Sequence, residues 1–131
     1  MSLPKPILAR NRLPNRRPAI STSFESGGAR IDMTEGYYAD GRIAEIFLNA
    51  DRANSLLDFL MSDAAILASI ALQYGAPLDE IRHALKRDSR GKAASPIGEA
   101  IDRIEPRAAA NPRSMSPLSS ARNGSTGVTT L

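Results

Sequence analysis

Hydrophobic and polar residues alternate along two segments in the first half of the chain, and this period of two predicts strands. Within residues 20–38, Ile31 and Met33 alternate with polar neighbours. Gly27 and Gly28 interrupt the segment with a turn signal, because glycine tolerates positive φ. Residues 42–48 alternate in the same way after Asp40–Gly41, which is typical of a tight hairpin turn. We therefore expect an antiparallel meander of about three strands.

A long, mostly apolar segment predicts a helix over residues 56–74. The polar connection 49–54 precedes it, and either Asn54 or Ser55 can cap its first turn. A helix that is apolar around most of its girth is expected to be buried on several sides, packed on the sheet and on later helices. Part of this surface is a candidate subunit interface, because so small a body has few elements to cover it. Its polar residues recur at spacings of 4, 7 and 4 and predict one narrow stripe facing water: Asp58, Ser62, Ser69 and Gln73.

Two shorter helices are predicted after this one. Gly75 and Pro77 end the long helix and begin the next, which has Asp79 and Glu80 at its start and Lys86 and Arg87 at its end. The third helix starts at Ser95–Pro96, ends at Pro106 and carries an apolar stripe of Ile97, Ala100, Ile101 and Ile104. The predicted fold class is α+β: a small antiparallel sheet packed on a long central helix plus two shorter helices, with disordered basic termini.

The charges divide the 131 residues into three parts. All fourteen acidic residues lie within residues 20–106, whereas residues 1–19 hold five basic residues and four prolines, and residues 107–131 hold three arginines. Proline removes backbone donors, and neither end has enough apolar residues to offset the entropy of ordering. We predict a disordered or extended basic arm over 1–19, one α+β domain over 20–106 and a disordered tail over 107–131.

Candidate chemistry is sparse. The chain has no cysteine and one histidine, which excludes disulfides and thiolate metal sites. His83 lies off the apolar stripe of its helix, and we interpret it as a surface residue paired with Asp79 one turn earlier; a ligand or a proton carrier is the alternative. We expect no catalytic residues, no cofactor and no metal. No apolar run reaches the roughly 20 residues of a membrane span, and no secretory signal is evident, so we expect a cytoplasmic protein.

Three pieces of the sequence resemble the TSCPD domain, which is found in cobalamin-dependent ribonucleotide reductases and as short stand-alone bacterial proteins. The resemblance covers about residues 20–105. It rests on the strand with Gly41, Glu45, Ile46 and Phe47, on the join SIALQYGAPLDEI from Ser69, and on the helix from Ser95–Pro96. Ser95 stands where the family has a cysteine, so a thiol role does not operate at this position. The resemblance implies a link to ribonucleotide reduction rather than an independent reductase.

Three functions remain open at this stage. The first is a non-catalytic accessory or interaction module that partners a ribonucleotide reductase subunit in deoxyribonucleotide synthesis, with a homo-oligomer as a further expectation. The second is a nucleic-acid-associated protein that uses its basic arms, and the third is a small enzyme or ligand-binding dimer that depends on His83. The candidate interaction residues are Asn49, Arg52, Asn54, Asp58, His83, Arg16 and Arg17.

Overall fold

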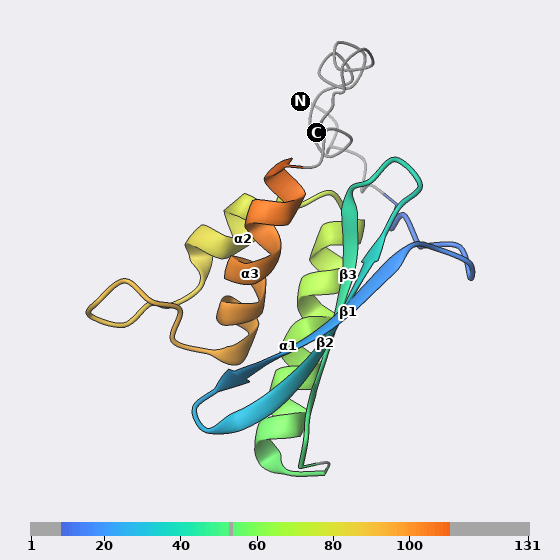
Figure 1. Ribbon diagram of the computed structural model, residues 1–131. Coiled ribbons are helices and arrows are strands. Elements are labelled where there is room, and N and C mark those ends of the chain that lie inside the picture. The colour runs from blue at the N-terminus through green and yellow to red at the C-terminus, as the bar shows by residue number, and fades with distance from the viewer. Residues whose placement is uncertain (1–8, 53, 111–131) are drawn as a thin grey trace, which may run out of the picture.

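The predicted elements are present in the predicted order. The structure is a computed structural model that describes residues 9–52 and 54–110. Strands β1 (Ala19–Ser26), β2 (Ala29–Tyr37) and β3 (Ile43–Ala50) form one antiparallel sheet in the order β1-β2-β3. Helices α1 (Leu56–Gln73), α2 (Leu78–Ala84) and α3 (Pro96–Ala110) complete the domain (Figure 1). The α+β fold class is therefore confirmed.

The hydrophobic core lies between one face of the sheet, α3 and the inner side of α1. The alternation predicted for β2 is confirmed, since Ile31 and Met33 are buried while Asp32 between them is exposed. From α1, small and flexible residues such as Ala65 and Met61 reach the same core. The largest apolar side chains with less than 2% exposure are Ile31, Met33, Ile46, Leu48, Ile101 and Ile104.

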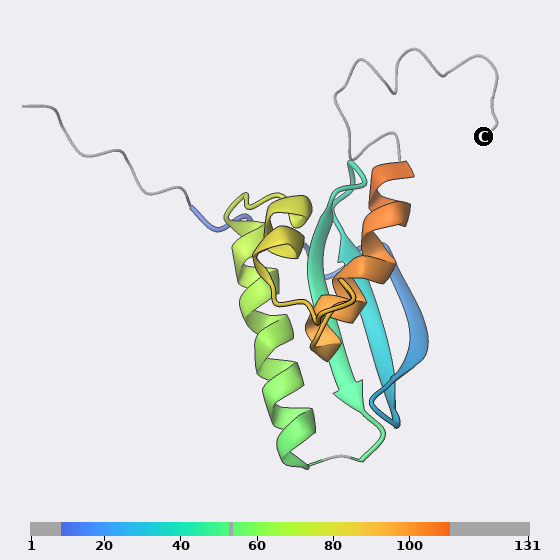
Figure 2. The ribbon, with the colours of Figure 1, turned by 90° about the vertical axis from the view of Figure 1, so that its left-hand side faces the viewer.

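Helix α1 lies beside the free edge of β3, so that α1, β3, β2 and β1 follow one another across the molecule (Figure 2). Polar side chains of α1 make hydrogen bonds to the backbone groups that β3 presents on this edge. The Asp58 carboxylate accepts from the Ala50 N–H at 2.8 Å. The Ser62 hydroxyl donates to the Leu48 carbonyl at 2.9 Å. These bonds satisfy groups that an edge strand otherwise leaves unpaired.

The same pairing continues to the end of the helix. The Ser69 hydroxyl oxygen accepts from the Ile46 N–H at 2.8 Å and lies 3.1 Å from the Ile46 carbonyl. The Gln73 side-chain amide donates to the Ala44 carbonyl at 3.0 Å. From Asp58 to Gln73 the helix rises about 22 Å over fifteen residue steps, and β3 spans about 20 Å over the six residue steps from Ala44 to Ala50, so the two elements match in length. We call these four α1 side chains and their β3 partners the edge ladder.

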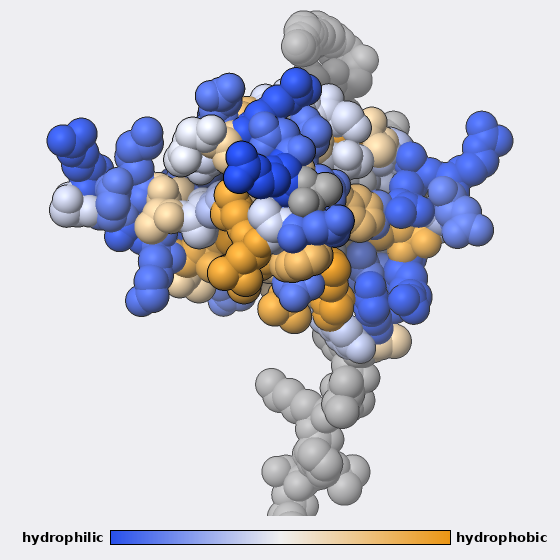
Figure 3. All heavy atoms as spheres, turned by 90° about the horizontal axis from the view of Figure 1, so that it is seen from below, coloured by the Kyte–Doolittle hydropathy of each residue, from blue (hydrophilic) through white to orange (hydrophobic). Residues whose placement is uncertain are grey.

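The edge ladder overturns the prediction that the polar stripe of α1 faces water. The stripe faces β3 because buried backbone donors and acceptors need polar partners. The expectation that α1 is buried on several sides is also wrong, since its outward side exposes large apolar residues, among them Leu56, Leu60 and Leu67. Seen from the end where α1 begins, hydrophobic side chains gather on this part of the surface (Figure 3).

The ends of α1 are fixed by local chemistry that was largely predictable. Ser55 is the N-cap, and its hydroxyl accepts from the Asp58 N–H at 3.1 Å. Gly75 follows the helix with φ of 104°, a conformation that glycine adopts without a side-chain clash. The predicted start of the polar connection at Asn49 is wrong by two residues. Strand β3 continues to Ala50 because Ala50 pairs with Ile31 and contributes to the core.

The two later helices end at different places than predicted. Helix α2 stops at Ala84, so Lys86 and Arg87 lie beyond it, where the chain turns into a loop closed by the Ala94 N–H donating to the Lys86 carbonyl at 3.1 Å. Helix α3 continues through Pro106 to Ala110 instead of ending at Pro106. A proline removes one helical hydrogen bond, and the following alanines have the highest helix propensity, so the helix is extended rather than stopped.

The described part of the N-terminal arm, residues 9–18, has no helix or strand and runs along the end of the domain. The Asn11 N–H donates to the Gln73 carbonyl at 2.8 Å, and the Tyr38 hydroxyl donates to the Asn11 carbonyl. The Tyr37 N–H donates to the Pro18 carbonyl at 3.0 Å and leads the chain into β1. Residues 1–8 and 111–131 lie outside the described residues, so the predictions for them stay predictions.

Removing one member of the edge ladder should destabilise the domain. Ser69→Ala leaves the Ile46 N–H without its acceptor in a buried position, which costs about 1–3 kcal/mol. We expect the free energy of unfolding, measured by urea denaturation, to fall by that amount. Ser23→Ala, on the exposed side of β1, is the matched control and should change it by less than about 0.5 kcal/mol. Equal stability of the two variants would contradict the ladder's role.

Candidate functional site

Four of the predicted interaction residues come together around the connection from β3 to α1. Asp58 has a structural role there, because its carboxylate accepts from the Ala50 N–H at 2.8 Å and from the Asn54 N–H at 3.4 Å. Asn54 has φ of 62°, a left-handed conformation that asparagine tolerates better than most residues. Asn49 and Arg52 are exposed. Asn54 is exposed as well, so Asn49, Arg52 and Asn54 are the side chains that this end of the domain offers to a partner.

A hollow of about 560 Å³ adjoins Arg52. Its wall combines the β1–β2 turn, through Gly27 and Gly28, with the start of α1, through Ser55 and Leu57. The two glycines have φ of 59° and 84°, which confirms the turn predicted for them. No local pattern indicated that this turn and Arg52 share one hollow, because the sheet brings them together across 24 residues of chain.

Arg17, a candidate contact in the basic arm, is bound within the domain. Its guanidinium lies 2.6 Å from the Glu45 carboxylate, and it also donates to the Pro14 carbonyl at 2.9 Å. Glu45 in turn packs over Gly36, where a side-chain carbon would collide with the carboxylate. The Arg17 charge therefore fastens the arm to β3. Arg16 is exposed, and the nucleic-acid alternative stays a prediction for it and for the undescribed part of the arm.

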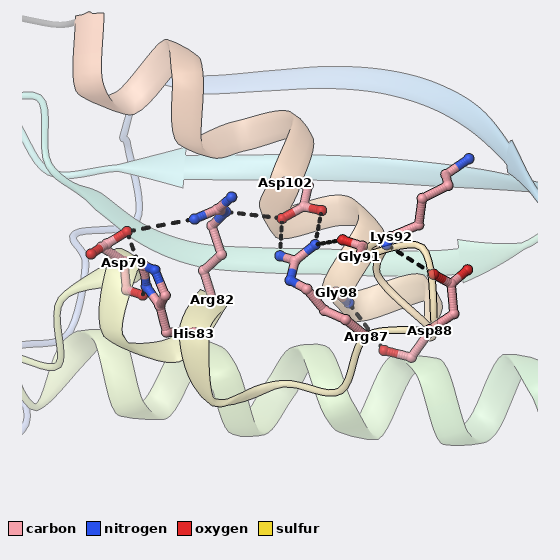
Figure 4. A network of polar contacts seen from close by, with 10 residues as sticks. Asp79, Arg82, His83, Arg87, Asp88, Gly91, Lys92, Gly98 and Asp102 are labelled. Carbon is pink, nitrogen blue, oxygen red and sulfur yellow. Dashed lines mark hydrogen bonds and ion pairs between the residues drawn. The ribbon is translucent and has the colours of Figure 1, made fainter.

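His83 lies on the surface of α2 and pairs with Asp79, as predicted. Its Nδ1 atom is 2.8 Å from the Asp79 backbone carbonyl and 3.4 Å from the Asp79 carboxylate (Figure 4). No group of three or more His, Cys, Asp or Glu side chains with metal-binding geometry occurs in the described part of the chain. His83 is thus placed apart from the Arg52 end of the domain, and the structure gives it a contact within its own helix turn.

A polar network that the sequence did not reveal joins α2, the following loop and α3. Asp102 of α3 accepts two hydrogen bonds from Arg87, at 2.6 and 2.9 Å, and one from Arg82 at 3.1 Å (Figure 4). The hydrogen bonds from Arg87 outweigh partial burial and hold the pKa of Asp102 below its ordinary value of 3.8. The partners lie 15 and 20 residues away in the chain, so no local pattern indicated the pairing.

The edge ladder, the Arg17–Glu45 pair and the Asp102 network hold nine polar side chains in contacts within the domain. What the described surface leaves available is of two kinds: the polar end with Asn49, Arg52 and the hollow, and the apolar outward side of α1.

The TSCPD domain family matches residues 6–110, most of the chain, and the chain belongs to this family. The match begins inside the N-terminal arm, in keeping with the contacts that residues 9–18 make. No solved structure is significantly similar to the chain.

The similar curated proteins are vitamin B12-dependent ribonucleotide reductases. Those of Streptantibioticus cattleyicolor and Streptomyces coelicolor are 44% identical over 70 residues, which is 53% of this chain and 12% and 7% of theirs. The protein of Agrobacterium fabrum is 38% identical over 71 residues, 54% of this chain and 6% of its own. The similarity therefore concerns one small region of these enzymes.

The Asp102 network should make stability depend on acid pH. Because the pKa of Asp102 is lower in the folded protein than in the unfolded chain, the ionised carboxylate stabilises the fold above pH 3.8, and this is lost as the pH falls through the folded pKa. We expect Asp102→Asn to lower the melting temperature at pH 7 and to lose less stability than the wild type on acidification below pH 3.8. Asp32→Asn, in an exposed pair with Arg30, is the control and should follow the wild type at both pH values. Parallel melting curves for Asp102→Asn and the wild type would refute the network's contribution.

Proposed function

We propose that this protein is a non-catalytic accessory module that associates with a vitamin B12-dependent ribonucleotide reductase and serves deoxyribonucleotide synthesis in the cytoplasm. The observation that carries the proposal is the family match over residues 6–110, combined with similarity to the reductases that spans 12% or less of their length. The chain thus shares a domain with these enzymes, and a shared domain brings with it a shared mode of contact with the rest of the enzyme.

The geometry of the domain supports a binding role. Asp58, Arg17, Arg87 and Asp102 bind other parts of the fold, at distances of 2.6 to 2.9 Å. Side chains held in this way fix a rigid surface, and a rigid surface binds a partner with little loss of conformational entropy. The role that follows is the presentation of a preformed surface to a larger protein.

We place the polar contact with the reductase at the end of the domain that bears Arg52. Arg52 is exposed beside the hollow formed by Gly27, Gly28 and Leu57, so a partner side chain can enter the hollow while Arg52 pairs with a carboxylate or a carbonyl at its rim. Arginine is enriched at protein interfaces, where its planar guanidinium makes several hydrogen bonds at once.

The test is direct binding of the full chain to the purified B12-dependent reductase of the same organism, measured by biolayer interferometry. We expect saturable binding, and we expect Arg52→Glu to weaken it by at least about tenfold, or ~1.4 kcal/mol. Arg90→Glu, an equal change of charge on the exposed loop between α2 and α3, is the matched control and should leave binding unchanged.

Two results would count against these statements separately. If the wild-type chain shows no binding to the reductase, the accessory function is wrong. If the chain binds but Arg52→Glu and Arg90→Glu behave alike, the function stands and the placement of the contact at Arg52 is wrong.

A further inference from the structure

The outward side of α1 is the largest unexplained feature of the described surface. Leu56 is 72% exposed, Leu67 68% and Leu60 60%, values that large aliphatic residues rarely have in a folded domain. Together with Phe59, Ile66 and the C-cap residue Tyr74 they extend over the whole length of α1. The helical spacing places them on the side of α1 that faces away from its core residues Met61, Ala65, Ala68 and Leu72, and Asp63 is the polar residue among them. We call this set the outward face.

The area of the outward face is that of a protein interface. With about 200 Å² for a fully exposed large side chain, the exposed fractions of these residues and of Leu57 correspond to roughly 750 Å². The largest apolar patch on a typical monomer is about 300–600 Å², and each partner in a standard interface buries about 800 Å². One copy of this face is therefore about half of a standard interface, so two copies would complete one.

The charges around the outward face favour a particular arrangement of two copies. Asp63, the acidic residue within the outward face, lies in the first half of α1, whereas Asp58 is turned toward β3 in the edge ladder. The basic arm meets its last turn, where Arg10 donates to the Gln73 side chain at 2.6 Å and exposed Arg12 follows Asn11. Two helices packed antiparallel bring the acidic half of each helix beside the basic end of the other. Their helix dipoles then point in opposite directions, which is electrostatically favourable. A parallel pair would place like charges together.

We propose that the outward face of α1 is a two-fold interface between two copies of this chain, in which α1 packs antiparallel to α1 of the second copy. The two-fold axis places Leu56 of one copy opposite Tyr74 of the other copy. Leu60 and Leu67 lie nearer the centre of the interface. Rows of apolar residues at three- and four-residue spacing are the surfaces that interlock when two helices pack. The proposal concerns the chain by itself and does not depend on the reductase.

The edge ladder argues against α1 as a helix that crosses a membrane. By length and composition α1 is apolar enough to cross a bilayer. To do so it would have to leave β3, which would expose four polar side chains to hydrocarbon and strip the edge of β3 of its hydrogen bonds. A second protein surface covers the outward face without disturbing the ladder.

The first experiment is light scattering coupled to size exclusion, with the full chain at micromolar concentrations. We expect the wild type to have twice the mass of one chain and Leu67→Asp to have the mass of one chain, with circular dichroism showing that the variant is folded. Ile20→Asp, which changes an exposed apolar residue on β1 at the other side of the sheet, is the matched control and should remain a dimer.

Orientation can be tested because the chain contains no cysteine. A mixture of Leu56→Cys and Tyr74→Cys chains should form the mixed disulfide under mild oxidation, whereas a parallel pair would crosslink Leu56→Cys to itself.

A wild-type chain that is monomeric throughout the micromolar range would overturn the proposal. So would a monomer whose binding to the reductase, or to anionic vesicles, is lost in Leu67→Asp, because the face would then have a different occupant.

Discussion

The fold depends on how the free edge of β3 is satisfied. A three-stranded sheet has two edges, and an edge strand presents backbone donors and acceptors that must find partners once they are removed from water. Here the partners are side chains of α1: Asp58, Ser62, Ser69 and Gln73 bind backbone groups between Ala44 and Ala50. The helix thus takes the place of a fourth strand, with side chains instead of backbone completing the hydrogen bonds.

This arrangement accounts for the surface of the domain. Because α1 directs its polar residues toward the edge of β3, only one flank of the helix contributes to the core. The core residues on that flank are Met61, Ala65, Ala68 and Leu72. Its other large apolar residues are then directed away from the sheet, because α2 and α3 lie on a different side. In most surface helices the apolar side faces the core. The leucines of α1 are exposed because the polar side of the helix forms hydrogen bonds with the backbone edge of β3.

The rest of the domain is fastened by charged pairs between distant segments. Arg17 joins the N-terminal arm to Glu45 of β3, and Asp102 joins α3 to two arginines on and after α2. Among the residues predicted to make interactions, Asp58 and Arg17 instead make contacts within the fold. Arg52 and Asn49 are exposed and can meet a partner. In the function proposed above, the domain that the chain shares with B12-dependent reductases supports these exposed residues.

The sequence by itself determined the elements of this protein, because their signals are local. Alternation gave β2, the Gly27–Gly28 and Asp40–Gly41 turns gave the meander, and Ser55 and Gly75 set the ends of α1. The TSCPD resemblance likewise rests on short motifs. Only the tertiary structure decided which side of α1 faces the sheet, since an Asp-Ser-Ser-Gln stripe suits water and a strand edge equally well. It also decided the partners of Asp102 and Arg17, because those ion pairs join residues 15 to 28 positions apart, beyond the reach of any local pattern.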